Sequence, residues 1–269
     1  MDVITSLSNS RIKRLRALRQ AKYRRREGLF LVEGLRLVQE ALELGAPVET
    51  LVYAPELLVS EHGQAMVEKF PPEARLAVSA RVFASLSDRD KPQGLLAVVR
   101  AQPQSLEAVP LVADLLVLVA WQLRDPGNLG SIIRTADAVG AHAVLVVAPS
   151  VDLYDPHCVR ATMGSLFALP VVPVPEAEEL APWLERVRGE IADLLVLGTS
   201  AHGAKVLFDV NLTRPVVILL GPEQRGLPTP ARELADEMAF LPMVGRATSL
   251  NVSAAAAVFS YEVLRQRRA

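Results

Sequence analysis

Three short segments carry polar residues directly after apolar runs of the chain. The first, residues 121–136, follows the aliphatic run 115–120 and contains a Pro126-Gly127 turn, after which Asn128 is expected to cap a helix. Arg134 lies off the apolar stripe of that helix, so its guanidinium can point towards the strand ends. Taken alone, the spacing favours an ordinary capped helix with a surface arginine.

The second segment, residues 221–228, follows the apolar run 216–220. Gly221 and Gly226 permit close approach of the backbone to a ligand, and a tight strand-to-helix turn explains them equally well. Glu223 would repel a phosphate group, and the loop lacks the lysine of a P-loop. No Gly-rich dinucleotide fingerprint follows a strand, which argues against a nucleotide-dependent oxidoreductase.

The third segment, residues 241–253, follows the end of another expected strand. Ser249 can cap the last helix of the chain. Asn251 is then expected just inside an alanine-rich helix, where asparagine is unfavourable because its side chain competes for backbone hydrogen bonds. That position indicates a role for Asn251 beyond local structure.

An alternation of strands and helices positions these segments. Continuous aliphatic runs are typical of parallel strands buried on both faces, and they occur at 115–120, 144–147, 171–174, 194–197 and 216–220. Helical periods lie between and after them, at 129–139, 156–163, 176–188, 230–235 and 250–267. We therefore predict a doubly wound α/β sheet, which binds ligands beyond the carboxyl ends of its strands.

A smaller α/β unit precedes this sheet. Strands are expected at 29–33, 51–53, 76–79 and 94–99, with helices at 35–45 and 55–70. Residues 101–110 contain two prolines and show no clear period, which is typical of a linker. The predicted organisation is an N-terminal domain over 1–102, a linker over 103–110 and a C-terminal domain over 111–269.

The charge of the chain is unevenly distributed. Its 269 residues hold 29 basic and 30 acidic side chains, a net charge of −1. The first 26 residues contain nine of the basic side chains and one of the acids, which leaves 20 basic and 29 acidic residues in the remainder. A basic arm on an acidic body indicates contact with a polyanion, most often nucleic acid, although a solvated helix face is the commoner meaning of a charge run. The candidate contacts are Arg11, Lys13, Arg24, Arg25 and Arg26.

Composition excludes several other classes of protein. With 51% hydrophobic and 22% charged residues, the chain is globular and not disordered. One cysteine, Cys158, cannot form an intramolecular disulfide, and a cytoplasmic protein is expected. No apolar run is long enough to span a membrane. His142, His157 and His202 have no partner cysteines or acidic cluster at ligand spacing, so no metal site is expected.

Together, the three segments resemble the three motifs of the SpoU/TrmH group of the SPOUT superfamily, the RNA ribose 2′-O-methyltransferases. The order and spacing of the motifs agree over residues 111–269. Residues 8–13 and 30–34 are similar to the substrate-binding domain that accompanies this group, which is related to RNA-binding ribosomal proteins. The resemblance implies a parallel sheet with a C-terminal trefoil knot, S-adenosylmethionine as cofactor, an RNA partner and a homodimer.

The motif positions carry over one by one. The resemblance assigns catalytic roles to Asn128, Arg134, Glu223, Ser249 and Asn251, and cofactor binding to Gly221, Leu241 and Leu250, with Leu197, Gly198, Thr199 and Met243 nearby. The separate N-terminal domain favours rRNA over tRNA as the substrate. A tRNA 2′-O-methyltransferase and a non-catalytic RNA-binding member of the fold remain the alternatives, and cofactor binding distinguishes the second of them.

Overall fold

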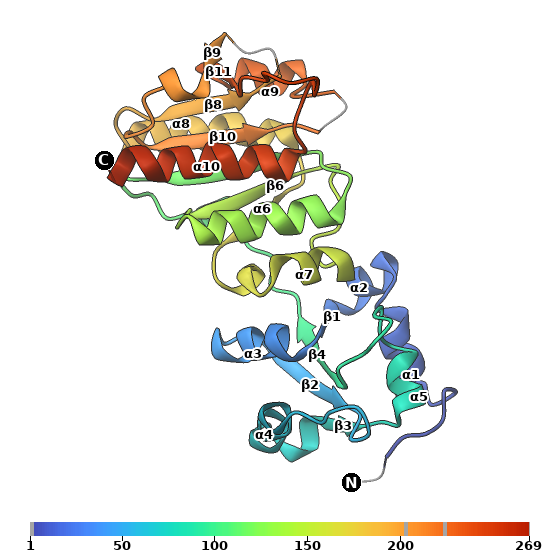
Figure 1. Cartoon of the computed structure of the whole chain (residues 1–269). Coiled ribbons are helices and arrows are strands. Elements are labelled where there is room, and N and C mark those ends of the chain that lie inside the picture. Colours follow the sequence, from blue (N-terminus) through green and yellow to red (C-terminus); the bar gives the residue numbers. More distant parts are fainter. Residues whose placement is uncertain (1–2, 202–203, 223–224, 269) are drawn as a thin grey trace. The chain divides into compact units, whose positions relative to one another are not determined.

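The computed structural model describes residues 3–201, 204–222 and 225–268, which form two compact units (Figure 1). Unit 1 comprises residues 1–102 and 152–167, and unit 2 comprises residues 103–151 and 168–269. Each unit has its own sheet, covered by helices. The predicted α/β class, with a small N-terminal unit and a parallel-sheet unit, is confirmed.

Unit 1 is built on a four-stranded sheet in the order β1-β4-β2-β3. Its strands are β1 (Leu29–Glu33), β2 (Val48–Tyr53), β3 (Arg75–Ala77) and β4 (Leu95–Arg100). β4 runs antiparallel to β1 and β2, and β2 runs parallel to β3. Alternate residues of β1 serve two cores, because Leu29 and Leu31 pack with one set of helices and Phe30 and Val32 with another.

The helices of unit 1 are α1 (Ser10–Ala17), α2 (Ala21–Glu27), α3 (Leu35–Glu43), α4 (Glu61–Lys69), α5 (Ala80–Ala84) and α7 (Pro156–Thr162). The prediction of a helix from residue 55 is wrong at its start. Ser60 has an extended backbone and its hydroxyl accepts a hydrogen bond from the Gly63 amide, which begins the helix at Glu61.

The segment 152–167 packs with unit 1, although it lies in the range predicted for the C-terminal domain. The Tyr154 ring stacks on Phe30, with 4.5 Å between the ring centroids. The Arg24 guanidinium lies 2.6 Å from the Asp152 carboxylate. Neither partner is a neighbour in sequence, so the periodicity of the segment carried no sign of this packing.

Unit 2 contains a seven-stranded sheet in the order β7-β6-β5-β10-β8-β11-β9, with every pair parallel. The strands are β5 (Leu116–Trp121), β6 (Ala143–Val147), β7 (Val171–Val174), β8 (Leu195–Thr199), β9 (Lys205–Val206), β10 (Val216–Leu220) and β11 (Glu237–Phe240). All residues of β5, β6 and β10 are buried, as expected for aliphatic strands with helices on both faces.

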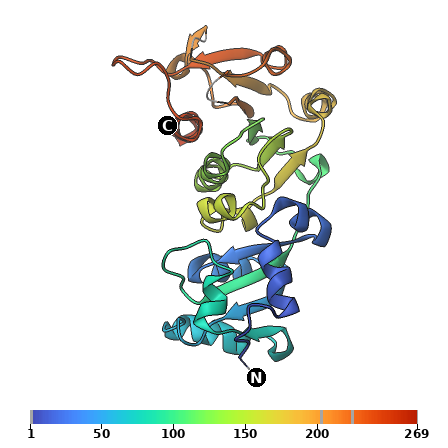
Figure 2. The same cartoon turned by 90° about the vertical axis from the view of Figure 1, so that its right-hand side faces the viewer.

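Helices cover both faces of this sheet (Figure 2). They are α6 (Pro126–Ala138), α8 (Leu180–Glu190), α9 (Thr229–Glu233) and α10 (Val252–Arg268). Trp183, Leu184 and Val187 of α8 pack against one face. On the other face, α10 lies beside α6, and Arg267 near its C-terminal end donates hydrogen bonds to the carbonyls of Asp114 and Leu115.

Short 3-10 turns complete the chain, at Pro72–Ala74, Leu106–Ala108, Ser165–Phe167, Ala177–Glu179 and Leu207–Asp209. Among the described residues, no helix is long and apolar enough to cross a membrane. The same residues contain no group of three or more histidine, cysteine or acidic side chains that could hold a metal ion.

Candidate active site

The strand order of unit 2 brings the three motif segments to one edge of the sheet. β10 lies between β5 and β8, and β8 lies between β10 and β11. Because all four strands are parallel, their carboxyl ends meet at the same edge. The segments that follow them begin at Gln122 after β5, Ser200 after β8, Gly221 after β10 and Leu241 after β11.

The N-terminus of α6 forms one side of this edge. The expectation that Asn128 caps the helix is wrong, because Asp125 occupies the cap position and Pro126 the first helical turn. The Asp125 carboxylate accepts a hydrogen bond from the Asn128 amide nitrogen at 2.8 Å. Asn128 therefore lies within the first turn, and its side chain is not used for capping.

Asn251 is the residue that caps α10. The helix begins at Val252, so the expectation of Asn251 inside the helix and of Ser249 as its cap is wrong. Asn251 Oδ1 accepts hydrogen bonds from the Ser253 amide at 2.9 Å and from the Ser253 hydroxyl at 2.6 Å. Asparagine is one of the best cap residues, which removes its conflict with the alanine-rich helix. Ser249 lies exposed two residues before it.

A hydrogen bond between two amide side chains joins the first and third motifs. Asn251 Nδ2 donates to Asn128 Oδ1 at 2.9 Å, across 123 residues of sequence. Because both donors of Ser253 meet Asn251 Oδ1, the Nδ2 group of that amide is directed to Asn128. Ser253 was missed by the sequence reasoning. Its signal was its place two residues after a capping asparagine.

Arg134 is exposed on α6 and lies six residues after Asn128. Its guanidinium makes no ion pair or hydrogen bond with the described residues. A guanidinium presents several donors in a planar arrangement that matches phosphate and carboxylate oxygens. Arg134 thus offers a free cation on the helix whose first turn carries Asn128.

Main-chain groups and apolar side chains form the part of the edge expected to hold the cofactor. A Cβ on Gly221 would lie 2.5 Å from the Leu227 amide, and one on Gly198 would lie 2.3 Å from the sulfur of Met238. The Gly221 contact is with backbone, so this position requires glycine, whereas a side chain at position 198 would require Met238 to move. The Thr199 hydroxyl donates to the Leu219 carbonyl at 2.9 Å, which ties β8 to β10.

The apolar residues at this edge differ in exposure. Leu197 is wholly buried and Leu241 is 9% exposed, whereas Met243 and Leu250 are 37% and 40% exposed. Glu223, the predicted acid of the second motif, lies outside the described residues.

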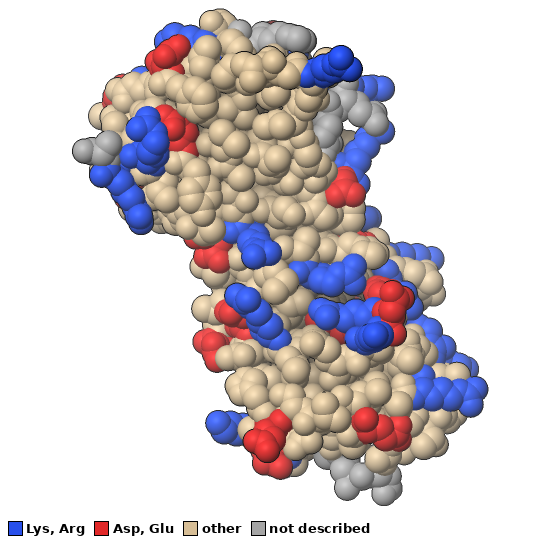
Figure 3. Space-filling model, in the orientation of Figure 1, with Lys and Arg blue, Asp and Glu red and all other residues tan. Residues whose placement is uncertain are grey.

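The basic arm folds as α1 and α2, and Figure 3 shows Lys and Arg side chains gathered over this part of unit 1. Arg11, Lys13 and Arg25 are exposed and form no ion pair with the described residues. Arg26 pairs with Glu27 at 2.8 Å. Hydrogen bonds from Arg26 and Arg14 hold the pKa of the Glu27 carboxyl below its usual value.

Arg24 differs from its neighbours, and its assignment as an RNA contact is corrected. Its side chain is 4% exposed, and its guanidinium donates to the Asp152 carboxylate and to the carbonyls of Leu18 and Arg19. The Asp155 carboxylate lies 3.6 Å away. Every side of the guanidinium is occupied, so Arg24 holds α2 in place and is unavailable to a phosphate.

Comparison with known proteins agrees with this architecture. The SpoU rRNA Methylase family model matches residues 115–261, and the MRM3-like substrate binding domain model matches residues 9–97. A 23S rRNA (uridine(2479)-2′-O)-methyltransferase of Streptomyces viridochromogenes is 37% identical over 96% of this chain and 91% of its own length. The chain belongs to the SpoU rRNA methylase family. The resemblance drawn from the three motifs is thereby confirmed.

One solved structure and one further relative bear on cofactor and substrate. The crystal structure of the SpoU methyltransferase AviRb from Streptomyces viridochromogenes, in complex with the cofactor AdoMet, superimposes with a TM-score of 0.90. It is 36% identical and covers 97% of this chain and 98% of its own. The 23S rRNA (guanosine(2553)-2′-O)-methyltransferase RlmP of Bacillus subtilis is 27% identical over 98% of this chain and 99% of its own length.

Proposed function

We propose that this protein transfers a methyl group from S-adenosylmethionine to the ribose 2′-oxygen of a nucleotide in 23S rRNA. The observation that carries the proposal is the Asn251–Asn128 hydrogen bond, which joins the third motif to α6, the helix that also carries Arg134. The relatives and the solved structure named above support the reaction and the class of RNA.

The reaction depends more on alignment of the reacting atoms than on activation of the methyl donor. When bound, S-adenosylmethionine supplies a methyl group on a positively charged sulfur, so no metal is needed. The bond from the ribose 2′-oxygen to the methyl carbon forms as the carbon–sulfur bond breaks, and the hydroxyl proton passes to a phosphate oxygen or to water. Positioning of the reactants contributes several kcal/mol to such a displacement, on the order of 7–11 in favourable cases.

Arg134 is proposed to bind the phosphate next to the target ribose and to stabilise the developing charge on the 2′-oxygen. A guanidinium stays protonated in proteins, so a neutral arginine acting as the base is disfavoured. Asn128, Ser249 and Asn251 orient the ribose and the guanidinium by hydrogen bonds. Glu223 is assigned to ordering of the loop after β10.

The cofactor is proposed to lie against the ends of β8, β10 and β11. Main-chain groups of Leu197, Gly198, Thr199 and Gly221 would meet the polar edge of the adenosine. Leu241, Met243 and Leu250 would provide its apolar walls. The exposure of Met243 and Leu250 supports this assignment.

We also propose that the C-terminal segment of unit 2 forms a trefoil knot. Unit 2 is further proposed to form a homodimer, in which Arg134 serves a site shared between two subunits. Val258 and Tyr261 on α10 are 37% and 52% exposed, and Val244 is fully exposed. Such apolar surface supports an interface on this part of unit 2. Analytical ultracentrifugation of the purified protein measures its oligomeric state directly. A monomer that still methylates rRNA would contradict the shared site.

The proposed reaction is tested by mapping methylated nucleosides in RNA from cells with and without the gene. We expect one 2′-O-methyl mark to disappear from 23S rRNA and to return with the wild-type gene, but not with Arg134→Ala. Loss of a mark from tRNA instead would support the alternative substrate. Retention of every mark, with no saturable S-adenosylmethionine binding, would support a non-catalytic RNA-binding protein.

A further inference from the structure

Hydrogen bonds join the loops that follow β5 and β6 in unit 2. The Ser150 hydroxyl donates to the Val147 carbonyl at 2.7 Å and accepts a hydrogen bond from the Leu123 amide at 3.0 Å. The Val151 amide donates to the Leu123 carbonyl at 2.9 Å. Both main-chain polar groups of the buried Leu123 are therefore bonded to the loop after β6, which lies outside the three motif segments.

Gln122, the first residue after β5, has a strained backbone. Its φ is +51°, in the left-handed region that glycine adopts most readily. Two hydrogen bonds hold it there: its amide donates to the Val147 carbonyl at 3.1 Å, and its side-chain Nε2 donates to the Ala148 carbonyl at 3.3 Å. Strain of this kind persists where the surrounding contacts determine the conformation, and it is commonest at functional sites. Gln122 lies at the sheet edge that carries the motif segments.

The loop after β5 leads directly to the first turn of α6. Residues 124–127 make the connection, and Pro126 among them has a restricted φ. The Asp125 carboxylate caps the helix by accepting a hydrogen bond from the Asn128 amide nitrogen at 2.8 Å. Asn128 Oδ1 in turn accepts one from Asn251 Nδ2. Asn128 is thus held from two sides, by the third motif and by a loop that is itself fixed to the loop after β6.

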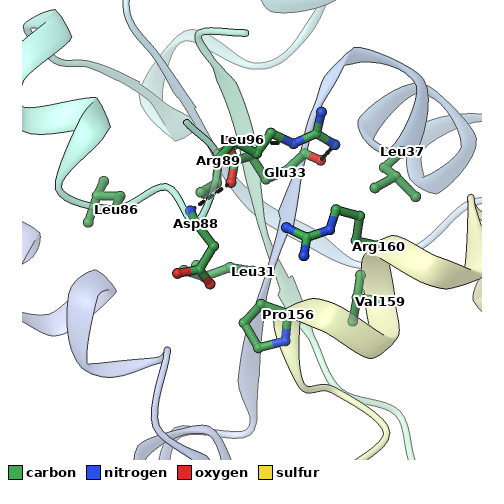
Figure 4. A pocket seen from close by; sticks show the side chains of 10 residues that line it. All are labelled: Leu31, Glu33, Leu37, Leu86, Asp88, Arg89, Leu96, Pro156, Val159 and Arg160. Atoms are coloured by element: carbon green, nitrogen blue, oxygen red, sulfur yellow. Dashed lines mark hydrogen bonds and ion pairs between the residues drawn. The ribbon is translucent and has the colours of Figure 1, made fainter. Parts of the chain in front are cut away.

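A serine of unit 1 makes the same two kinds of hydrogen bond away from the motifs. The Ser87 hydroxyl donates to Glu33 Oε1 at 2.5 Å and accepts a hydrogen bond from the Arg89 amide at 2.9 Å. Glu33 and Arg89 stand beside a cavity of about 20 Å³, which has room for one water (Figure 4). Ser87 therefore serves the packing of unit 1 and provides a matched comparison for Ser150.

We propose that Ser150 and Gln122 are positioning residues for the methyl transfer. By fixing the loop after β5, they hold the start of α6 so that Asn128 meets Asn251 and Arg134 keeps its place on the same helix. Misplacement of a reacting group by about 1 Å can lower the rate about 100-fold. Neither residue needs to contact RNA or S-adenosylmethionine, because each acts through Asn128. The inference rests on the proposed function.

Gln122→Gly should change stability and activity in different directions. It relieves the backbone strain, so we expect a melting temperature no lower than that of the wild type. It also removes the Nε2 hydrogen bond and frees the loop, so kcat for methylation of a 23S rRNA transcript should fall about fivefold, less than a misplacement of about 1 Å would cost. Binding of S-adenosylmethionine and the KM for RNA should stay unchanged. Wild-type kcat in this variant would overturn the role of Gln122.

Ser150→Ala leaves the buried Leu123 amide without its partner, so we expect kcat to fall about tenfold. Ser87→Ala is the matched control, because it also removes a hydroxyl that accepts from a backbone amide. It should lower the melting temperature by a similar amount and leave kcat as in the wild type. Ser150→Thr keeps the hydroxyl and should restore most of the rate. Unchanged kcat in Ser150→Ala, or an equal loss in Ser87→Ala, would overturn the inference.

A double-mutant cycle shows whether Ser150 acts through Asn128. In an Asn128→Ala background, Ser150→Ala should cause no further loss of kcat, and additive losses would overturn the inference. Hydrogen exchange of residues 122–130, followed by mass spectrometry, gives a readout that needs no turnover. We expect faster exchange in Ser150→Ala and Gln122→Gly, but not in Ser87→Ala. If the wild type leaves 23S rRNA unmethylated, the proposed function fails, whereas unchanged exchange in Ser150→Ala overturns the positioning role even then.

Discussion

The polar residues of the two units are organised in opposite ways. In unit 2, Asn128, Asn251 and Ser253 bond to one another, so the cluster is in place before a ligand arrives. In unit 1, Arg11 and Arg25 are exposed and have no ion-pair partner among the described residues. A group that aligns reacting atoms must be held rigidly, whereas a group that attracts a phosphate backbone acts over several ångströms and can adapt to it.

The largest expected effect is on the rate of methyl transfer. Arg134→Ala should lower kcat by about 10²–10³-fold, the usual effect of removing one group that stabilises transition-state charge. Methylation of the 23S rRNA transcript measures it, with S-adenosylmethionine binding as the control. Arg134→Lys keeps the charge and should recover little of the rate. Near-full turnover by the lysine variant would contradict both the phosphate-binding role and the role as a base.

A second variant tests whether Arg24, unlike the exposed arginines of the basic arm, stabilises the fold. Arg24→Ala should lower the free energy of unfolding by about 3 kcal/mol, because it leaves the Asp152 charge without its buried partner. Urea unfolding measures this change. Arg25→Ala, at the next position, is the matched control and should leave stability within about 0.5 kcal/mol. Equal stability of the two variants would mean that the Arg24 contacts are unimportant.

A third variant tests the preorganisation in unit 2. Ser253→Ala removes the hydroxyl that donates to Asn251 Oδ1, so we expect kcat to fall about tenfold, a coupling of roughly 1.4 kcal/mol. The KM for RNA and S-adenosylmethionine binding should be unchanged, and Ser253→Thr should restore the rate. In an Asn251→Ala background, Ser253→Ala should cause no further loss. Additive losses would show that Ser253 acts independently of Asn251.

The smallest effect is expected on the exposed arm. Exchanging Lys13 and Arg25 for glutamate should weaken binding of 23S rRNA. The slope of log affinity against log salt concentration should become shallower by about one for each phosphate contact that is lost. S-adenosylmethionine binding and the melting temperature should stay as in the wild type. A parallel loss of cofactor binding would identify the arm as a structural element and not an RNA surface.

Local patterns were sufficient for much of the architecture. The aliphatic runs before Gln122 and Gly221 predicted parallel strands because burial on both faces demands apolar residues at every position. Since parallel strands end at one edge, the motif segments were expected to meet there, and the observed strand order brings them together. The order and spacing of the three motifs also identified the family.

Local sequence pattern did not predict the exact roles of single polar residues. Asn128 and Ser249 both precede or begin helical periods, yet Asp125 and Asn251 are the caps. A cap is decided by which residue leaves helical φ and ψ, and several adjacent polar residues satisfy the same sequence rule. The pairing of Asn251 with Asn128 was not predicted, because the two residues are 123 positions apart and Asn128 was expected to cap its own helix.

By itself, the sequence determined the two α/β parts, the parallel strands of the second, the family, and the residues at the ends of those strands. Only the tertiary structure decided that Arg24 is buried while Arg25 is exposed, and that α7 packs in unit 1. The physical reason is the sequence separation between the residues that interact. Periodicity and strand burial act between residues a few positions apart, whereas Arg24 meets Asp152 across 128 residues, and that partner is known only when the chain has folded.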